Sequence, residues 1–323
     1  AHVSWAREMC IRDRWEVLYV AASNRLPLCM AVVNRALSGP LNINSEHSDS
    51  MGARDSGWIQ IYAENNQEAY DNFIQAYRIS EHKDVMLPIM ICQDGFITSH
   101  AVENITLMET EDVKKFVGTY EPEHFLLNPE EPMAVGPYAV SNYCMEAKRA
   151  QAQAMMNAKQ VILDVADEFR GLTGRGFGLF EEYCLDDAEY AIVAIGSACG
   201  TIKDAIDKMR GEGKKVGLLK VRVFRPFPGK EMAEALKDCK AVGIFDRCES
   251  YSANGGPLGA ELMAAMYRNK NQAETVNYIY GLSGRDLTVE QVEETFDELM
   301  QTAEEGTAGN AYRYIGLRDN MED

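Results

Sequence analysis

The stretch EYAIVAIGSACGTIKDAIDKMRGEGKKVGLLKVRVF, residues 189–224, decides the fold class. Residues 189–195 are a short apolar run, which predicts a buried strand. Thr201 is then expected to cap a helix. The residues of this helix that would face the core are Ile202, Ala205, Ile206 and Met209. A second apolar run, residues 216–224, predicts the next strand, and strand, helix and strand in close succession indicate a parallel sheet.

The same alternation continues toward the C-terminus. After residue 224 the pattern predicts a helix, a strand, a helix and a strand, at residues 230–236, 241–246, 260–267 and 275–280. Thr288 and Gln291 have the spacing of a capping box, which predicts the start of a last helix. Repeated strand–helix units of this kind predict a doubly wound α/β domain, which we place at residues 185–323.

A second domain of the same class is expected in the N-terminal part, at residues 1–142. Its strands are expected at residues 28–33, buried on both faces, and at 58–62 and 86–92. Asn65 with Glu68 predicts the start of the intervening helix, whose inner face would carry Ala69, Phe73, Ala76 and Tyr77.

The part between the two domains is expected to hold a connector and a helix. Prolines and acidic residues between about 102 and 142 indicate the connector. A linking helix is predicted within residues 143–184 and would pack on one domain through Ala158, Val161, Ile162, Val165 and Phe169.

Composition excludes several classes of function. The formal charge of -18 repels nucleic acid and anionic membranes, so we expect neither as a partner. No apolar run reaches the length of a membrane span. The eight cysteines and five histidines are dispersed without a C-x-x-C pair, which predicts reduced thiols, a cytoplasmic protein and no metal held by this chain. Residue 1 is Ala, and we expect the chain to be a fragment, with the charged residues 6–14 outside any clear pattern.

Candidate chemistry lies where apolar strands end, because ligands of parallel sheets bind beyond the carboxyl ends of the strands. Arg35, the loop 94–100 and the loop 196–201 follow such runs. An isolated arginine is more often a surface cation than a ligand. The side chains of the loop 94–100 are expected to fix that loop, the loop 196–201 is expected to serve packing, and the charge-dense loop 46–55 is expected to be a solvated face.

Several short segments together resemble the alpha subunit of the pyruvate:ferredoxin oxidoreductase (pyruvate synthase) family, from about Val17 to about Leu299. They are Arg25-Leu-Pro, Val33-Asn-Arg-Ala-Leu-Ser38, Glu46-His-Ser-Asp-Ser50, Ala53-Arg-Asp-Ser-Gly-Trp58, Asn66-Gln-Glu-Ala69, Asp94-Gly-Phe96, Ser99-His100 and Phe224-Arg-Pro-Phe-Pro228. The resemblance implies a partial thiamine-diphosphate pyrimidine-binding domain followed by a transketolase C-terminal-like domain. It also implies oxidative decarboxylation of pyruvate with coenzyme A to acetyl-CoA, carbon dioxide and reduced ferredoxin.

By the same resemblance, Arg35 is the catalytic and substrate-binding residue, since the arginine of the Asn-Arg-Ala motif contacts the substrate carboxylate in this family. Thiamine diphosphate would be shared with a beta subunit that holds Mg²⁺ and a [4Fe-4S] cluster, and gamma and delta subunits and ferredoxin complete the set of partners. The family's cofactor-binding Glu and Thr lie upstream of residue 1. The chain alone is therefore expected to be inactive.

Three alternatives stay open at this point. The chain could belong to a paralogue that acts on branched-chain or other 2-oxo acids, because every such substrate carries the same carboxylate. It could be a non-catalytic assembly subunit of a thiamine enzyme. A transketolase or pyruvate dehydrogenase component that does not use ferredoxin is the third. In related enzymes the second domain serves mainly assembly, and we expect the same here.

Overall fold

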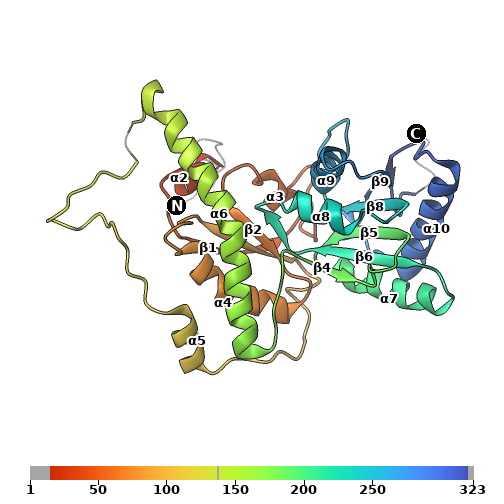
Figure 1. Cartoon of the computed structure of the whole chain (residues 1–323), viewed down its shortest axis with the longest axis horizontal. Coiled ribbons are helices and arrows are strands. Elements are labelled where there is room, and N and C mark those ends of the chain that lie inside the picture. Colours follow the sequence, from red (N-terminus) through yellow and green to blue (C-terminus); the bar gives the residue numbers. More distant parts are fainter. Residues whose placement is uncertain (1–14, 137, 319–323) are drawn as a thin grey trace.

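The computed structural model describes residues 15–136 and 138–318. The charged stretch 6–14 lies outside the described residues. Two α/β halves lie side by side, each built around a mostly parallel sheet (Figure 1). We call the half around the sheet of β1 (Cys29–Asn34) the first half and the half around the sheet of β5 (Tyr190–Ile195) the second half. The strand order in the first sheet is β1, β3 (Ile89–Asp94), β2 (Ile59–Tyr62), β7 (Val223–Arg225). In the second sheet it is β10 (Tyr312–Tyr314), β9 (Glu274–Ile279), β8 (Ala241–Asp246), β5, β6 (Val216–Val221), β4 (Phe180–Tyr183). The expected fold class, two α/β units with parallel sheets, is confirmed.

The first sheet comes mainly from the N-terminal part. Strands β1 (Cys29–Asn34), β3 (Ile89–Asp94) and β2 (Ile59–Tyr62) are parallel, and β7 (Val223–Arg225) joins β2 in the antiparallel direction. Helices α4 (Asn66–Ser80) and α6 (Ser141–Thr173) pack on one face of this sheet. Residues of α2 (Glu16–Ser23) and α3 (Ser48–Gly52) pack on the other face.

The second sheet is doubly wound, as expected. Its strands are β4 (Phe180–Tyr183), β5 (Tyr190–Ile195), β6 (Val216–Val221), β8 (Ala241–Asp246), β9 (Glu274–Ile279) and β10 (Tyr312–Tyr314). Only β4 is antiparallel to its neighbour in this sheet, within the described residues. One face carries α7 (Ala198–Gly211) and α10 (Val289–Glu305), and the other carries α8 (Gly229–Ala235) and α9 (Pro257–Arg268).

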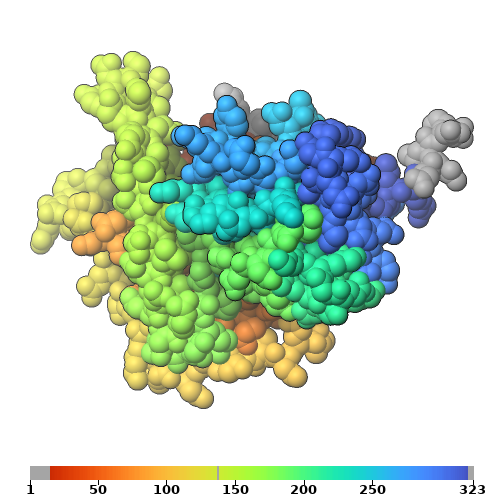
Figure 2. Space-filling view, turned by 45° about the vertical axis from the view of Figure 1, so that its right-hand side comes forward, coloured from red at the N-terminus to blue at the C-terminus, as the bar shows by residue number. Residues whose placement is uncertain are grey.

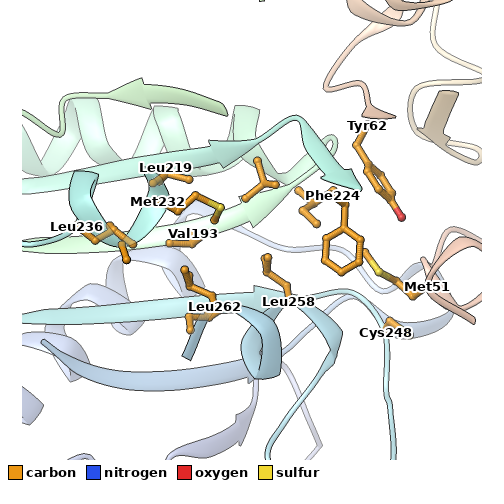
Figure 3. Close-up of a cluster of buried hydrophobic side chains, with 14 of the residues drawn as sticks. Met51, Tyr62, Val193, Leu219, Phe224, Met232, Leu236, Cys248, Leu258 and Leu262 are labelled. Atoms are coloured by element: carbon orange, nitrogen blue, oxygen red, sulfur yellow. The ribbon is translucent and has the colours of Figure 1, made fainter. Parts of the chain in front are cut away.

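The two halves share a core at their junction. Phe224 of β7 lies next to Met51 and Tyr62 of the first half, and the same cluster continues to Leu258 and Leu262 of the second (Figure 3). The rings of Phe224 and Tyr62 meet edge to face at 6.4 Å, an arrangement that aromatic pairs favour. Because apolar side chains from both halves are buried in one cluster, their packing holds the sheets together.

Three local expectations are wrong. The run 216–224 is not one strand: Arg222 interrupts it, and β6 and β7 belong to different sheets. The N-cap position of α7 is Ser197, not Thr201, and its side chain makes no capping hydrogen bond; the expected inner face of that helix is buried. Strand β1 is not buried on both faces, because it forms the edge of its sheet, where Met30 is 40% exposed.

The inner face of α4 is only partly as expected. Asn65 caps the helix by accepting from the main chain of Glu68, which confirms the start. Ala76 is buried, but Tyr77 is exposed. Polar residues of the helix are buried instead, because they bind arginines from later in the chain. Asn72 accepts a hydrogen bond of 2.9 Å from Arg222, and Asp71 pairs with Arg175 at 2.7 Å.

The connector between the halves contains a short helix that the sequence pattern did not reveal, α5 (Thr110–Val117). The linking helix α6 is confirmed, and all five of its expected inner residues are buried. Its first ten residues, 141–150, are exposed and project from the body of the molecule (Figure 2). Among the described residues, no helix is both long and apolar enough to cross a membrane.

Candidate active site

Arg35 lies at the carboxyl end of β1, where the sequence places it. Its side chain is exposed, and it forms neither a hydrogen bond nor an ion pair with the residues that the structure describes. Its main-chain N–H, in contrast, donates to Asp49 Oδ2 at 3.0 Å. The main chain at Arg35 is therefore held, while the guanidinium remains available to an anion.

A cluster of polar side chains fixes the strand end on which Arg35 stands. Asn34 is buried and donates from Nδ2 to Asp49 Oδ1 and to Ser50 Oγ, both at 2.7 Å. Ser50 Oγ also lies 2.9 Å from the hydroxyl of Tyr62 in β2. Burial raises the pKa of Asp49, opposed by the hydrogen bonds that it accepts from Asn34, Arg35 and Ser50. These contacts tie the end of β1 to helix α3.

Asp94, at the carboxyl end of β3, forms the centre of a buried cluster between the halves. Its carboxylate contacts His47 Nε2 at 2.6 Å and Arg247 at 3.3 Å, and it accepts from the main chain of Ser197 at 2.9 Å. Burial opposes ionisation, but the charges of His47 and Arg247 outweigh it and hold the pKa of Asp94 well below its usual range. The carboxyl edges of the two sheets therefore meet at this residue.

The structure explains the loop 94–100 without a ligand. We expected the carboxylate of Asp94 to fix its own loop, and this is wrong, because the carboxylate binds Ser197 and Arg247 of the second half instead. Gly95 is required because a Cβ there would lie 2.4 Å from the carbonyl oxygen of Asn34. Phe96 has a φ of 62° and stacks on His100 at 4.7 Å between ring centroids. The carboxylate and the imidazole of this loop are thus separated, one buried and one exposed.

The loop 196–201 is structural, in agreement with its interpretation from sequence. A Cβ at Gly196 would lie 2.9 Å from Asp94 Oδ2, so the carboxylate fills the space beside the start of α7. Since Ser197 donates its main-chain N–H to that carboxylate, this amide is already satisfied within the chain.

The loop 46–55 is not a solvated face, and that expectation is wrong. His47 is 2% exposed and Ser50 is equally buried. The physical reason is the second half of the molecule, which covers the loop: His47 N donates to the carbonyl oxygen of Arg247 at 2.9 Å. The sequence did not reveal that His47 and Asp49 make structural contacts, although the many charged residues of this loop were apparent.

A group of carboxylates elsewhere holds a lysine. Glu64, Glu68 and Glu181 lie close enough to one another to suggest a metal site. Lys220 of β6 stands among them, with Nζ at 2.5–2.6 Å from each. Burial opposes its charge, but these carboxylates outweigh burial and raise the pKa of Lys220. The ammonium therefore neutralises the acidic groups and ties α4 to the second sheet.

Known proteins match both halves. Residues 14–167 match the family described as pyruvate flavodoxin/ferredoxin oxidoreductase, thiamine diphosphate-binding, and residues 188–292 match pyruvate:ferredoxin oxidoreductase core domain II. The pyruvate synthase subunit PorA of Methanocaldococcus jannaschii is 45% identical over 306 residues, 94% of this chain and 76% of that protein. PorA of Thermotoga maritima is 45% identical over 304 residues, with the same coverage of 94% and 76%.

More distant relatives widen the comparison. The ketoisovalerate oxidoreductase subunit VorA of Pyrococcus abyssi is 38% identical over 304 residues, 94% of this chain and 76% of that protein. A solved 2-oxoglutarate:ferredoxin oxidoreductase from Magnetococcus marinus has the same fold, with a TM-score of 0.57 at 17% identity. The match covers 88% of this chain and 50% of that one.

These matches define a class, the subunits of 2-oxoacid oxidoreductases that use thiamine diphosphate. Within that class, the chain belongs to the pyruvate:ferredoxin oxidoreductase family. The resemblance seen in the sequence is thereby confirmed. Both PorA relatives are named as subunits, so these proteins are parts of multi-subunit complexes.

The described residues near Arg35 include one cation and two carboxylates. The guanidinium of Arg35 is exposed and has no partner among the described residues. Thiamine enzymes also need a carboxylate against the pyrimidine ring, and the carboxylates of Asp49 and Asp94 are both engaged within the chain. These two residues therefore do not fit the pyrimidine contact.

Proposed function

We propose that this chain is the alpha subunit of a pyruvate synthase. The complete enzyme would convert pyruvate and coenzyme A to acetyl-CoA and carbon dioxide, passing two electrons to ferredoxin. The 45% identity with PorA subunits over nearly the whole chain supports this activity. The observation that supports the role of this chain is the guanidinium of Arg35, which has no partner among the described residues and lies at the carboxyl edge of a parallel sheet.

Arg35 would bind the carboxylate of pyruvate and thereby orient the neighbouring carbonyl carbon for reaction. An arginine suits this task because its planar fork can donate to both carboxylate oxygens at once. Holding the substrate in one orientation lowers the barrier, since the entropy of positioning is already lost before reaction. The fixed main chain at Arg35 supports this role, because a held backbone limits where the guanidinium can reach.

The same proposal includes the other subunits, the cofactors and the domains of this chain. We assign Mg²⁺, the diphosphate of thiamine and a [4Fe-4S] cluster to a beta subunit, and we expect gamma and delta subunits beside it. Residues 1–142 would form the partial pyrimidine-binding domain, 143–184 the linking region and 185–323 the transketolase C-terminal-like domain. The described cysteines are free thiols, which supports a cytoplasmic enzyme.

The test is the substitution Arg35→Ala in the complete complex. We expect kcat/KM for pyruvate to fall by about 2–5 kcal/mol of transition-state binding, roughly 30- to 5,000-fold. Arg35→Lys should recover part of the loss, because it restores the charge without the fork. Arg268→Ala is the matched control, since Arg268 is also exposed but ends α9, in the other half.

Two other outcomes would change the proposal. If Arg35→Ala leaves oxidation of 2-oxo acids intact while the complex still assembles, the chain is an assembly subunit. The 38% identity with VorA also favours a second candidate, a branched-chain 2-oxo acid as substrate. A higher kcat/KM for 2-oxoisovalerate than for pyruvate in the unmodified complex would establish that candidate instead.

A further inference from the structure

Segment 44–50 lies between the end of β1 and the second half of the molecule. On the side of β1, three main-chain amides donate to it. Ala36 N donates to the carbonyl oxygen of Asn44 at 2.9 Å. Arg35 N donates to Asp49, and Leu37 N donates to Ser48 Oγ at 3.0 Å. Every residue from Arg35 to Leu37 is therefore bound to this segment through its main chain.

The other side of the same segment is bound to the second half. Gly284 N donates to the carbonyl oxygen of Ser45 at 2.9 Å. Ser283 N donates to Glu46 Oε2 at 3.0 Å. His47 adds a third contact, because its main-chain N–H donates to the carbonyl oxygen of Arg247 at 2.9 Å. Residues of segment 44–50 thus bind the second half on one side and the main chain of residues 35–37 on the other.

This double attachment makes the segment a mechanical link. Ser45 and His47 are 1% and 2% exposed, so the segment cannot shift without disturbing packed neighbours. Segment 44–50 is bound by the loop 281–284 of the second half. Three residues of this loop have a positive φ, at 62° for Gly281, 57° for Ser283 and 77° for Gly284. Such a loop has few alternative conformations that keep its amides in place.

Gly284 lies so close to Asn44 that there is no room for a side chain at position 284. A Cβ at this position would lie 2.4 Å from Asn44 Cβ and 3.2 Å from Asn44 Cγ. Asn44 Cβ is bonded to the main chain and cannot rotate away, so a side chain at position 284 would push the main chain of Asn44. The carbonyl oxygen of that residue is the acceptor for Ala36, one residue after Arg35.

We propose that the second half of the molecule positions the substrate through this link, with Gly284 as a positioning residue for Arg35. The inference rests on the proposed function of Arg35 as the group that binds the substrate carboxylate. It gives the second half a part in substrate binding, beyond the mainly assembling role that we expected from the sequence.

The experiment is a double-mutant cycle in the complete complex with Gly284→Ala and Arg35→Ala. Gly284→Ala alone should lower kcat/KM for pyruvate roughly 10- to 100-fold, since a displacement near 1 Å can cost about 100-fold. In the Arg35→Ala background the same change should have an effect below about 3-fold, because the group being positioned is gone. The KM for coenzyme A should be unchanged in both.

Gly306→Ala is the matched control. Gly306 also lies in the second half, with a φ of 65°, but a Cβ there meets nothing within 4 Å. It therefore reproduces the backbone strain without the push on Asn44. A second variant, Glu46→Ala, removes the bond to Ser283 without steric overlap, and it should lower kcat/KM for pyruvate in the same Arg35-dependent way.

The possible outcomes are distinct. If Arg35→Ala alone has no effect, both the proposed function and this inference fail. If Arg35→Ala has its expected effect but Gly284→Ala and Glu46→Ala act equally in both backgrounds, or match Gly306→Ala, only the positioning role is overturned. If Gly284→Ala prevents assembly of the complex, the result for Glu46→Ala decides.

Discussion

Two neighbouring strands of the first sheet end at charged residues, one of which is exposed and one of which is buried. Asn34 of β1 and Asp94 of β3 are register partners, so Arg35 and Asp94 lie at the same edge. Arg35 is held by its main chain and leaves its charge exposed. Asp94 is 1% exposed, and its charge is paired with His47 and Arg247.

The difference shows that position at a sheet edge does not by itself make a charged residue functional. A charge that is satisfied inside the chain holds the structure together, as Asp94 does between the two halves. A charge whose backbone is fixed but whose side chain has no partner among the described residues can bind a ligand, as we propose for Arg35. The comparison predicts that substitutions at the two sites affect different measurements.

The largest effect on stability is expected at Asp94. Asp94→Asn removes the charge that compensates Arg247 and His47 in a buried cluster. Breaking one partner of a buried ion pair costs about 3–5 kcal/mol, so the free energy of unfolding should fall by that amount in denaturant titration of the full chain.

Asp84→Asn is the control for that substitution. Asp84 pairs with His82 at 3.9 Å, but both side chains are exposed. An exposed pair contributes about 0–1 kcal/mol. Equal losses for the two variants would contradict the structural role given to Asp94.

A smaller effect is expected at a third carboxylate, Asp246 of β8, which caps α9 through the amides of Leu258 and Gly259. Burial raises its pKa to about 6, although the hydrogen bonds from Leu258, Gly259 and Asn277 oppose the shift. Its folded pKa exceeds the ordinary value near 4, so its contribution to stability is present below about pH 4 and lost as the pH rises through 6.

That pH window gives the prediction. As the pH rises from 4 to 7, the free energy of unfolding of the native chain should fall by roughly 1–3 kcal/mol more than that of the Asp246→Asn variant. Denaturant unfolding at several pH values compares the two slopes. Parallel slopes would show that Asp246 keeps an ordinary pKa in the folded protein.

The smallest effect on stability is expected at Arg35. Since its side chain is exposed and has no partner among the described residues, Arg35→Ala should change the free energy of unfolding by less than about 0.5 kcal/mol. The same denaturant titration measures it. A loss as large as that of Asp94→Asn would mean that Arg35 holds the fold and that the contrast between the two strand ends is wrong.

Much of the fold was predictable because it depends on local patterns. The strands at 190–195 and 241–246 are short apolar runs, and Asn65 and Thr288 cap their helices as their spacing predicts. The failures come from contacts between distant residues. The residues next to Arg222 in the sequence do not indicate that its side chain binds Asn72, or that Phe224 belongs to the other sheet.

The candidate site was predicted in part for the same reason. The position of Arg35 follows from a strand end and a short motif, both of which are local. The mistake over the loop 46–55 arose because charge density alone cannot distinguish a solvated loop from one that is covered by another domain. Segment 44–50 is covered by residues 247 and 281–284, more than 190 positions away in the chain.

The contact between Arg35 and pyruvate would be seen in a structure of the assembled complex with pyruvate bound. We expect the guanidinium of Arg35 to make a bidentate contact with the substrate carboxylate, at about 2.7–2.9 Å from nitrogen to oxygen. A bound pyruvate whose carboxylate is held by other residues, with the side chain of Arg35 directed into solvent, would contradict it.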